Sequence, residues 1–131
     1  MIPIYIPYLN KKAKRYVTKS IDTNWISSQG AYIGKFEKAL AKYHKVKYCI
    51  ATSGGTSALH LTLKSLNLGK GDEVICPDLT FIAPANMIVL SGAKLRLVDI
   101  DLETLTIDHK KIEKKINKKT KAIMVVHQFG H

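Results

Sequence analysis

The stretch that decides the fold is residues 48–68, which read YCIATSGGTSALHLTLKSLNL. Its apolar first part, residues 48–52, predicts a short strand, and the glycine pair that follows ends this strand. Leucines recur through residues 56–68 at helical spacing and cover more than one face, which predicts a buried helix. The stretch thus predicts a strand, a glycine turn and a helix, an order that is typical of an α/β protein.

The same alternation continues toward the C-terminus. Further strands are predicted at residues 73–76, 94–100 and 121–127, and further helices at residues 81–90 and 108–115. Asp108 is expected to cap the second of these helices. The last strand is a continuous apolar run, which is typical of a sheet covered on both faces. We therefore expect an α/β fold with a mixed, mostly parallel sheet and covering helices.

The N-terminal part of the chain has helical rather than alternating patterns. An extended segment is predicted at residues 2–9, helices at residues 11–23 and 35–43, and a loop at residues 24–33. We expect residues 1–45 to form a helical segment within one incomplete domain that covers residues 1–131.

The composition is that of a globular chain with a strong basic excess: 46% of the residues are hydrophobic, 24% are charged, and the formal net charge is +11. A basic chain can bind nucleic acid or an anionic membrane. However, the lysines of residues 110–121 fall on the solvated side of a predicted helix, and no aromatic side chains lie between them to stack bases. No apolar run approaches the roughly 18 residues of a membrane span, and the N-terminus lacks a signal-peptide pattern. We expect a cytoplasmic protein that binds neither nucleic acid nor membrane.

One pair of residues, and the two cysteines, bear on whether the chain binds a metal ion. Asp99 and Asp101 form an Asp-x-Asp pair at a strand end, which can hold a divalent metal, but such a pair is also typical of a turn. Cys49 and Cys76 lie far apart and have no metal-type spacing with a histidine. We interpret the aspartates as turn residues and the cysteines as buried thiols of a reducing compartment, and expect no metal.

The residues after the first predicted strand are suited to binding an anion. Gly54 and Gly55 free the backbone, and Thr56 and Ser57 begin the predicted helix. Unpaired N–H groups at a helix N-terminus, with the helix dipole behind them, attract phosphate, and the two hydroxyls can add hydrogen bonds. The segment is equally typical of a capped helix after a glycine turn, and it is not a Walker P-loop.

Motifs along the whole chain resemble, in the same order, those of the DegT/DnrJ/EryC1/StrS family of sugar aminotransferases. They lie at residues 25–30 with 36–37, 53–59, 71–75 with 77–81, 98–101, and 127–130. The opening is most similar to the perosamine-synthase branch, which aminates a GDP-linked 4-keto-6-deoxy sugar. Gly54 departs from the family pattern, because relatives commonly carry asparagine there; the change removes a side chain but keeps the backbone donors.

The resemblance implies the N-terminal part of the large domain of a fold-type I aminotransferase, with pyridoxal 5'-phosphate (PLP) as cofactor. It implies that Gly55, Thr56 and Ser57 hold the PLP phosphate and that Phe81 stacks on the cofactor ring. Without the resemblance, Phe81 would be interpreted as a core residue. Family members are usually homodimers whose active sites are shared between subunits.

Four further residues are candidates for substrate binding. Trp25, Ser27 and Ser28 belong to a loop that lies near the sugar pocket in relatives, although the same loop is typical of an ordinary turn in which Trp25 is a packing anchor. His127 ends the last predicted strand, at the edge where α/β sheets place their ligands. A histidine that is hydrogen-bonded within its own loop is an equally good interpretation.

The implied reaction transfers an amino group, with glutamate as donor, to a nucleotide-linked sugar such as GDP-4-keto-6-deoxymannose. In relatives, the lysine that binds PLP and the aspartate that pairs with the pyridine nitrogen lie beyond residue 131. We therefore assign no catalytic residue and expect the isolated chain to be inactive. The chain also stops just after a predicted buried strand, so the sheet is expected to be unfinished. A nucleotide-sugar 3-dehydrase of the same family, a basic nucleic-acid-binding domain and a decayed gene fragment are the alternatives.

Overall fold

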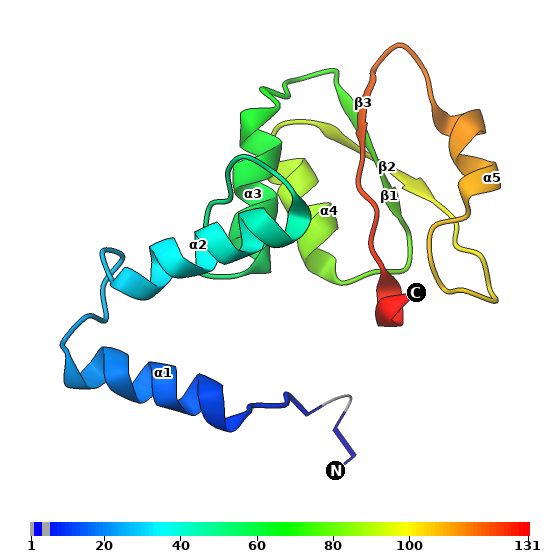
Figure 1. The fold of residues 1–131 in the computed structure, drawn as a ribbon. Coiled ribbons are helices and arrows are strands. Elements are labelled where there is room, and N and C mark those ends of the chain that lie inside the picture. Colours follow the sequence, from blue (N-terminus) through cyan, green and yellow to red (C-terminus); the bar gives the residue numbers. More distant parts are fainter. Residues whose placement is uncertain (1, 4–5) are drawn as a thin grey trace. The chain divides into compact units, whose positions relative to one another are not determined.

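The structure is a computed structural model that describes residues 2–3 and 6–131 (Figure 1). The chain divides into two compact units, Met1–Ala51 and Thr52–His131, and each is described by itself. Part of the predicted extended segment, residues 4–5, lies outside the described residues; residues 6–10 contain neither helix nor strand. No helix of the described residues is long and apolar enough to cross a membrane.

The first unit contains two helices, α1 Lys11–Asp22 and α2 Ala31–His44. Asn10 caps α1, because its side-chain oxygen accepts a hydrogen bond of 2.8 Å from the N–H of Ala13. The predicted start of the second helix was wrong by about a turn. A glycine such as Gly34 costs a helix only about 1 kcal/mol, and the added turn places the Tyr32 ring 5.1 Å from that of Tyr16.

The second unit is built around a parallel sheet of three strands in the order β2-β1-β3. The strands are β1 Glu73–Pro77, β2 Lys94–Val98 and β3 Thr120–Ile123, and the longer helices are α3 Gly55–Ser65 and α4 Ile82–Leu90. Both β2 and β3 pair in parallel with β1. A short helix, α5 His109–Ile112, continues into a 3-10 turn, Glu113–Lys115. The expected α/β fold with a parallel sheet is therefore present.

The core of the second unit lies on both faces of β1, which is buried along its whole length. Val74 and Cys76 face α3 and α4 and pack in one cluster with Leu63 and Ile88. The alternate residue Ile75 faces the opposite side, where it packs with Val98, Ile107 and Ile112. Figure 1 shows the same layering, with α3 and α4 on one side of the sheet and α5 on the other.

The strand predicted at residues 48–52 is wrong: the structure contains no strand there. An apolar run becomes a strand only where a neighbouring strand accepts its backbone hydrogen bonds. Here the N–H of Ala51 donates instead to Oε1 of Glu37 at 2.9 Å, and the side chains of Tyr48 and Ile50 are exposed. Cys49 is consequently half-buried rather than buried.

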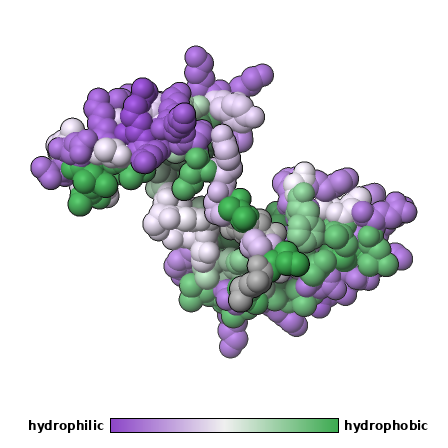
Figure 2. All heavy atoms as spheres, turned by 90° about the horizontal axis from the view of Figure 1, so that it is seen from below, coloured by the Kyte–Doolittle hydropathy of each residue, from purple (hydrophilic) through white to green (hydrophobic). Residues whose placement is uncertain are grey.

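The strand predicted at residues 121–127 was too long and was wrongly expected to be covered on both faces. β3 ends at Ile123, and half-buried residues alternate with exposed ones along it. One face of β3 packs against the core through Ala122, whereas Lys121 and Ile123 on the other face are exposed and lack a covering helix in the described part of the chain. Ile123 therefore reaches the surface, and Figure 2 shows that hydrophobic residues are exposed among hydrophilic ones in this chain.

The basic segment after Ile107 behaves as its pattern indicates. The Asp108 side chain accepts a hydrogen bond of 2.9 Å from the N–H of Lys110, so the predicted helix cap is confirmed. Ile112 packs against the core, whereas the lysines of residues 110–121 are exposed. Their charge is therefore solvated, except at Lys111, whose ammonium pairs with Asp99 and Asp108.

Candidate functional site

An open pocket of about 590 Å³ lies in the second unit, at the carboxyl-terminal edge of the parallel sheet. Three segments form it: the start of α3, the start of α4, which follows β1, and the residues that follow β3. They contribute Gly55, Thr56, Ala58, Leu59, Phe81, Ala83, Pro84, Met124, Val125, Val126 and His127. Ligands of parallel α/β sheets commonly bind at this edge, which makes the pocket the principal candidate site.

The start of α3 presents unused hydrogen-bond donors beside this pocket. The Gly54 carbonyl accepts the N–H of Ala58 at 3.1 Å, which closes the first turn. In the described part of the chain, the N–H groups of Gly55, Thr56 and Ser57 have no acceptor. Gly54 is the N-cap residue and provides no side chain to cap them. Three free donors and the positive end of the helix dipole therefore coincide at one point, a combination suited to phosphate.

Phe81 forms the aromatic wall of the pocket. It is the N-cap residue of α4 and is 75% exposed. The interpretation of Phe81 as a core residue is therefore wrong, because the helix that buries Ile88 begins one residue after Phe81 and directs this side chain away from the core. An exposed flat ring at a pocket wall can stack on a planar ligand.

His127 lines the same pocket, beyond the end of β3. Its Nδ1 atom lies 3.0 Å from the carbonyl oxygen of His131, so the ring is hydrogen-bonded within its own turn, as one of the two interpretations of the sequence had it. A donor role for Nδ1 in this bond would leave Nε2 as an acceptor.

The predicted substrate residues of the first unit belong to the loop between α1 and α2. Trp25 is anchored through its backbone, since its N–H donates to the carbonyl of Ser20 at 2.9 Å. The Ser27 hydroxyl accepts from the N–H of Gln29 at 3.3 Å, and both Ser27 and Ser28 are exposed. Their role in substrate binding stays a prediction.

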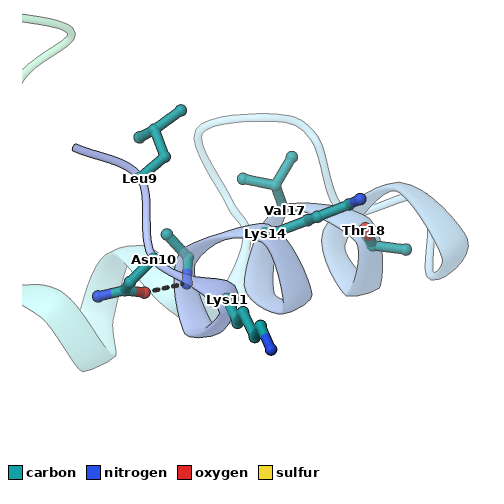
Figure 3. Close-up of a pocket in the computed structure, with 7 residues that line it drawn as sticks. Leu9, Asn10, Lys11, Lys14, Val17 and Thr18 are labelled. Carbon is teal, nitrogen blue, oxygen red and sulfur yellow. Dashed lines mark hydrogen bonds between the residues drawn. The ribbon is translucent and has the colours of Figure 1, made fainter. Parts of the chain in front are cut away.

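A different pocket, of about 400 Å³, lies beside α1 in the first unit (Figure 3). Leu9 and Val17 project to one side of the helix there, and the Asn10 side chain is already used as the helix cap. It contains none of the predicted site residues and no carboxylate or histidine. The pocket of the second unit, which contains predicted site residues and a histidine, is therefore the better candidate for a functional site.

The aspartate pair is occupied by structural contacts. Asp101 Oδ1 accepts the N–H groups of Glu103 at 2.9 Å and Thr104 at 3.1 Å, the turn that the sequence indicated. These bonds hold the pKa of Asp101 below its ordinary value. Asp99 binds the Lys111 ammonium at 2.6 Å, and that contact lowers the pKa of Asp99. Among residues 2–3 and 6–131, no group of three or more His, Cys, Asp or Glu is placed to hold a metal ion.

Sequence reasoning missed two sets of residues around the pocket. The side chains of Met124, Val125 and Val126 form a wall because the strand ends earlier than predicted. The hydroxyls of Thr52 and Ser53 lie directly before the glycine pair; the first bonds the Gly54 carbonyl and the second the Ser57 hydroxyl of α3. Thr52 and Ser53 could have been found from the sequence, because hydroxyl residues stand on both sides of the glycine pair.

The chain matches the DegT/DnrJ/EryC1/StrS aminotransferase family over residues 7–131. The GDP-perosamine synthases of Escherichia coli O157:H7 and Vibrio cholerae are 50% and 44% identical to it over 130 residues, 99% of this chain. These residues make up only 36% and 35% of the two relatives, so the chain spans about a third of their length.

Two solved structures have the same fold. An aminotransferase from Psychrobacter cryohalolentis is 33% identical with a TM-score of 0.84, over 92% of this chain and 31% of that one. The E. coli GDP-4-keto-6-deoxy-D-mannose-3-dehydratase with bound hydrated PLP is 26% identical with a TM-score of 0.82, over 94% of this chain and 33% of that one. The fold and the resemblance expected from the sequence are thus confirmed, and the chain belongs to the DegT/DnrJ/EryC1/StrS aminotransferase family.

Proposed function

We propose that the whole protein is a PLP-dependent aminotransferase that transfers an amino group from glutamate to a GDP-linked 4-keto-6-deoxy sugar. The observation that carries the proposal is the 44–50% identity to GDP-perosamine synthases over 99% of this chain. A 3-dehydratase of GDP-4-keto-6-deoxymannose is the second candidate, favoured by a TM-score of 0.82 but only 26% identity.

The pocket of the second unit fits PLP. The phosphate carries negative charge at neutral pH, and the free N–H groups of Gly55, Thr56 and Ser57 offer donors with the helix dipole behind them. The ring of Phe81 lies in the same pocket and is exposed for stacking on the cofactor ring. When bound, PLP supplies the electron sink that the transfer of an amino group requires.

The chain's own residues provide binding and orientation. The donors of α3 are held rigidly, because Leu63 of the same helix is only 2% exposed and anchors it in the core. Phe81 excludes water from one face of the proposed cofactor position. We assign substrate binding to Trp25, Ser27, Ser28 and His127, whose hydroxyl and ring-nitrogen groups suit a sugar.

The remaining parts of the proposal concern the whole protein. Residues 1–131 form part of the large, PLP-binding domain, with residues 1–45 as its helical N-terminal segment. The protein functions as a homodimer with shared active sites, in the cytoplasm, and binds neither nucleic acid nor membrane.

The test supplies the whole protein with PLP, glutamate and GDP-4-keto-6-deoxymannose and identifies the sugar product by mass spectrometry. We expect an amino sugar formed in equal amount to 2-oxoglutarate. The Phe81→Ala variant should form it more slowly, whereas Leu102→Ala, an exposed apolar residue outside the pocket, should match the wild type. A product that has lost its C3 hydroxyl would select the dehydratase instead. Failure to alter any nucleotide-linked 4-keto sugar would contradict both.

A further inference from the structure

We propose that Thr52 and Ser53 are positioning residues, which hold the phosphate-binding donors of α3 in place without touching the phosphate themselves. The inference rests on the proposed function. Each of the two hydroxyls makes one hydrogen bond: that of Thr52 donates to the carbonyl oxygen of Gly54, and that of Ser53 bonds the hydroxyl of Ser57.

Thr52 fixes the peptide that joins the two glycines. Its hydroxyl donates to the Gly54 carbonyl at 3.0 Å, and the N–H of Ala58 donates to the same oxygen at 3.1 Å. A peptide group is planar, with its C=O and N–H on opposite sides. Two donors on the Gly54 oxygen therefore also set the direction of the Gly55 N–H. Glycine has more backbone freedom than other residues, so this is the peptide that most needs to be held.

Ser53 orients the hydroxyl of Ser57. The two Oγ atoms lie 3.1 Å apart, so one hydroxyl donates to the other. With Ser53 as the donor, Ser57 keeps its own hydrogen for an anion. The Ser57 side chain would otherwise be distributed over several staggered rotamers.

The same contacts differ from those of an ordinary capped helix. In a capped helix, a serine or threonine near the start accepts a hydrogen bond from an N–H of the first turn. Neither Thr52 nor Ser53 does so: one donates to a carbonyl and the other bonds a hydroxyl, while the N–H groups of Gly55, Thr56 and Ser57 have no acceptor among the described residues. The polar side chains thus stabilise the turn and leave its donors free, and the exposed Phe81 ring shares the pocket.

The test compares pyridoxamine 5'-phosphate, which binds without a covalent bond, with pyridoxamine, which lacks the phosphate. In the whole protein, Thr52→Val and Ser53→Ala should each raise the dissociation constant for pyridoxamine 5'-phosphate about three- to tenfold, the loss of one hydrogen bond. Binding of pyridoxamine should not change. Thr52→Ser and Ser53→Thr, which retain the hydroxyl, should restore the affinity. Both residues are exposed, so the unfolding temperature of the unliganded protein should be unaffected.

A double-mutant cycle tests whether Ser53 acts through Ser57. Because the two hydroxyls bond each other, Ser53→Ala should have no further effect in a Ser57→Ala background. Unchanged affinity in both variants, an equal loss for pyridoxamine, or additive effects of Ser53 and Ser57 would overturn the inference alone. Absence of any binding of pyridoxamine 5'-phosphate to the wild type would overturn the proposed function, and the inference with it.

Discussion

Glu73 is a charged side chain that the fold buries at the start of β1, with only 6% of the residue exposed. Its Oε2 accepts a hydrogen bond of 2.8 Å from the Asn117 side chain. Nε of Arg96 lies 3.3 Å from the same oxygen, close enough for an ion pair although its N–H is not well aligned. The bond from Asn117, followed by the charges of Arg96, Lys94 and Lys119, holds the pKa of Glu73 below its ordinary value despite the opposing effect of burial.

This lowered pKa predicts how stability depends on pH. A carboxyl whose pKa falls on folding stabilises the folded state above its ordinary value of 4.5, and this contribution is lost as the pH falls through the folded pKa. Glu73→Gln should therefore lower the unfolding temperature at pH 7, and its deficit should shrink as the pH falls below 4.5. The exposed Glu113→Gln is the control and should match the wild type. If the unfolding temperature of Glu73→Gln stayed below that of the wild type by the same amount at every pH, the charge of Glu73 would not contribute to stability.

Properties of single residues could be predicted from the sequence where they depend only on neighbouring residues. The glycine pair and the hydroxyls of Thr56 and Ser57 indicated free donors, and the described backbone has them. The exposure of Phe81 could not be foreseen from its type, because an apolar ring ahead of a helix is ordinarily buried. The contacts of Thr52 and Ser53 depend on side-chain rotamers, which composition and spacing do not encode.

At the scale of elements, α4 connects the core to the pocket. Ile88 is fully buried against the sheet, Val89 next to it is 61% exposed, and the same helix begins at the pocket. Ile88→Ala should destabilise the protein by about 2–5 kcal/mol, because it leaves a cavity in the core. Val89→Ala should stay within about 0.5 kcal/mol of the wild type. The midpoint of urea unfolding measures both, and equal losses would contradict this assignment of faces.

The helices and the strands β1 and β2 followed from local patterns, whereas the errors concern pairing. β1 and β2 carry apolar residues that two layers of helix can cover, and both were predicted close to their observed ends. Residues 48–52 have the composition of a strand but no strand partner in the described chain. β3 ends at Ile123, and its only strand partner among the described residues is β1. Pairing joins residues far apart in sequence, so a single sequence specifies it poorly.

At the scale of the whole molecule, the candidate site exists only when three distant segments are brought together. The starts of α3 and α4 and the residues after β3 meet because β1 and β3 are parallel and end at the same edge. The pocket is thus a property of the folded second unit, and a ligand that binds it must favour folding over unfolding.

This coupling predicts a rise in the unfolding temperature of the whole protein with pyridoxamine 5'-phosphate. At a hundred times its dissociation constant, the ligand should add about 2.7 kcal/mol to the free energy of unfolding. Phe81→Ala should leave the unliganded protein unchanged, since that ring is 75% exposed, but should reduce the gain at the same ligand concentration. Leu102→Ala, also exposed in the second unit but outside the pocket, should retain the full gain. If Phe81→Ala retained it too, the ring would have no contact with the ligand, and the stacking assigned to it would be wrong.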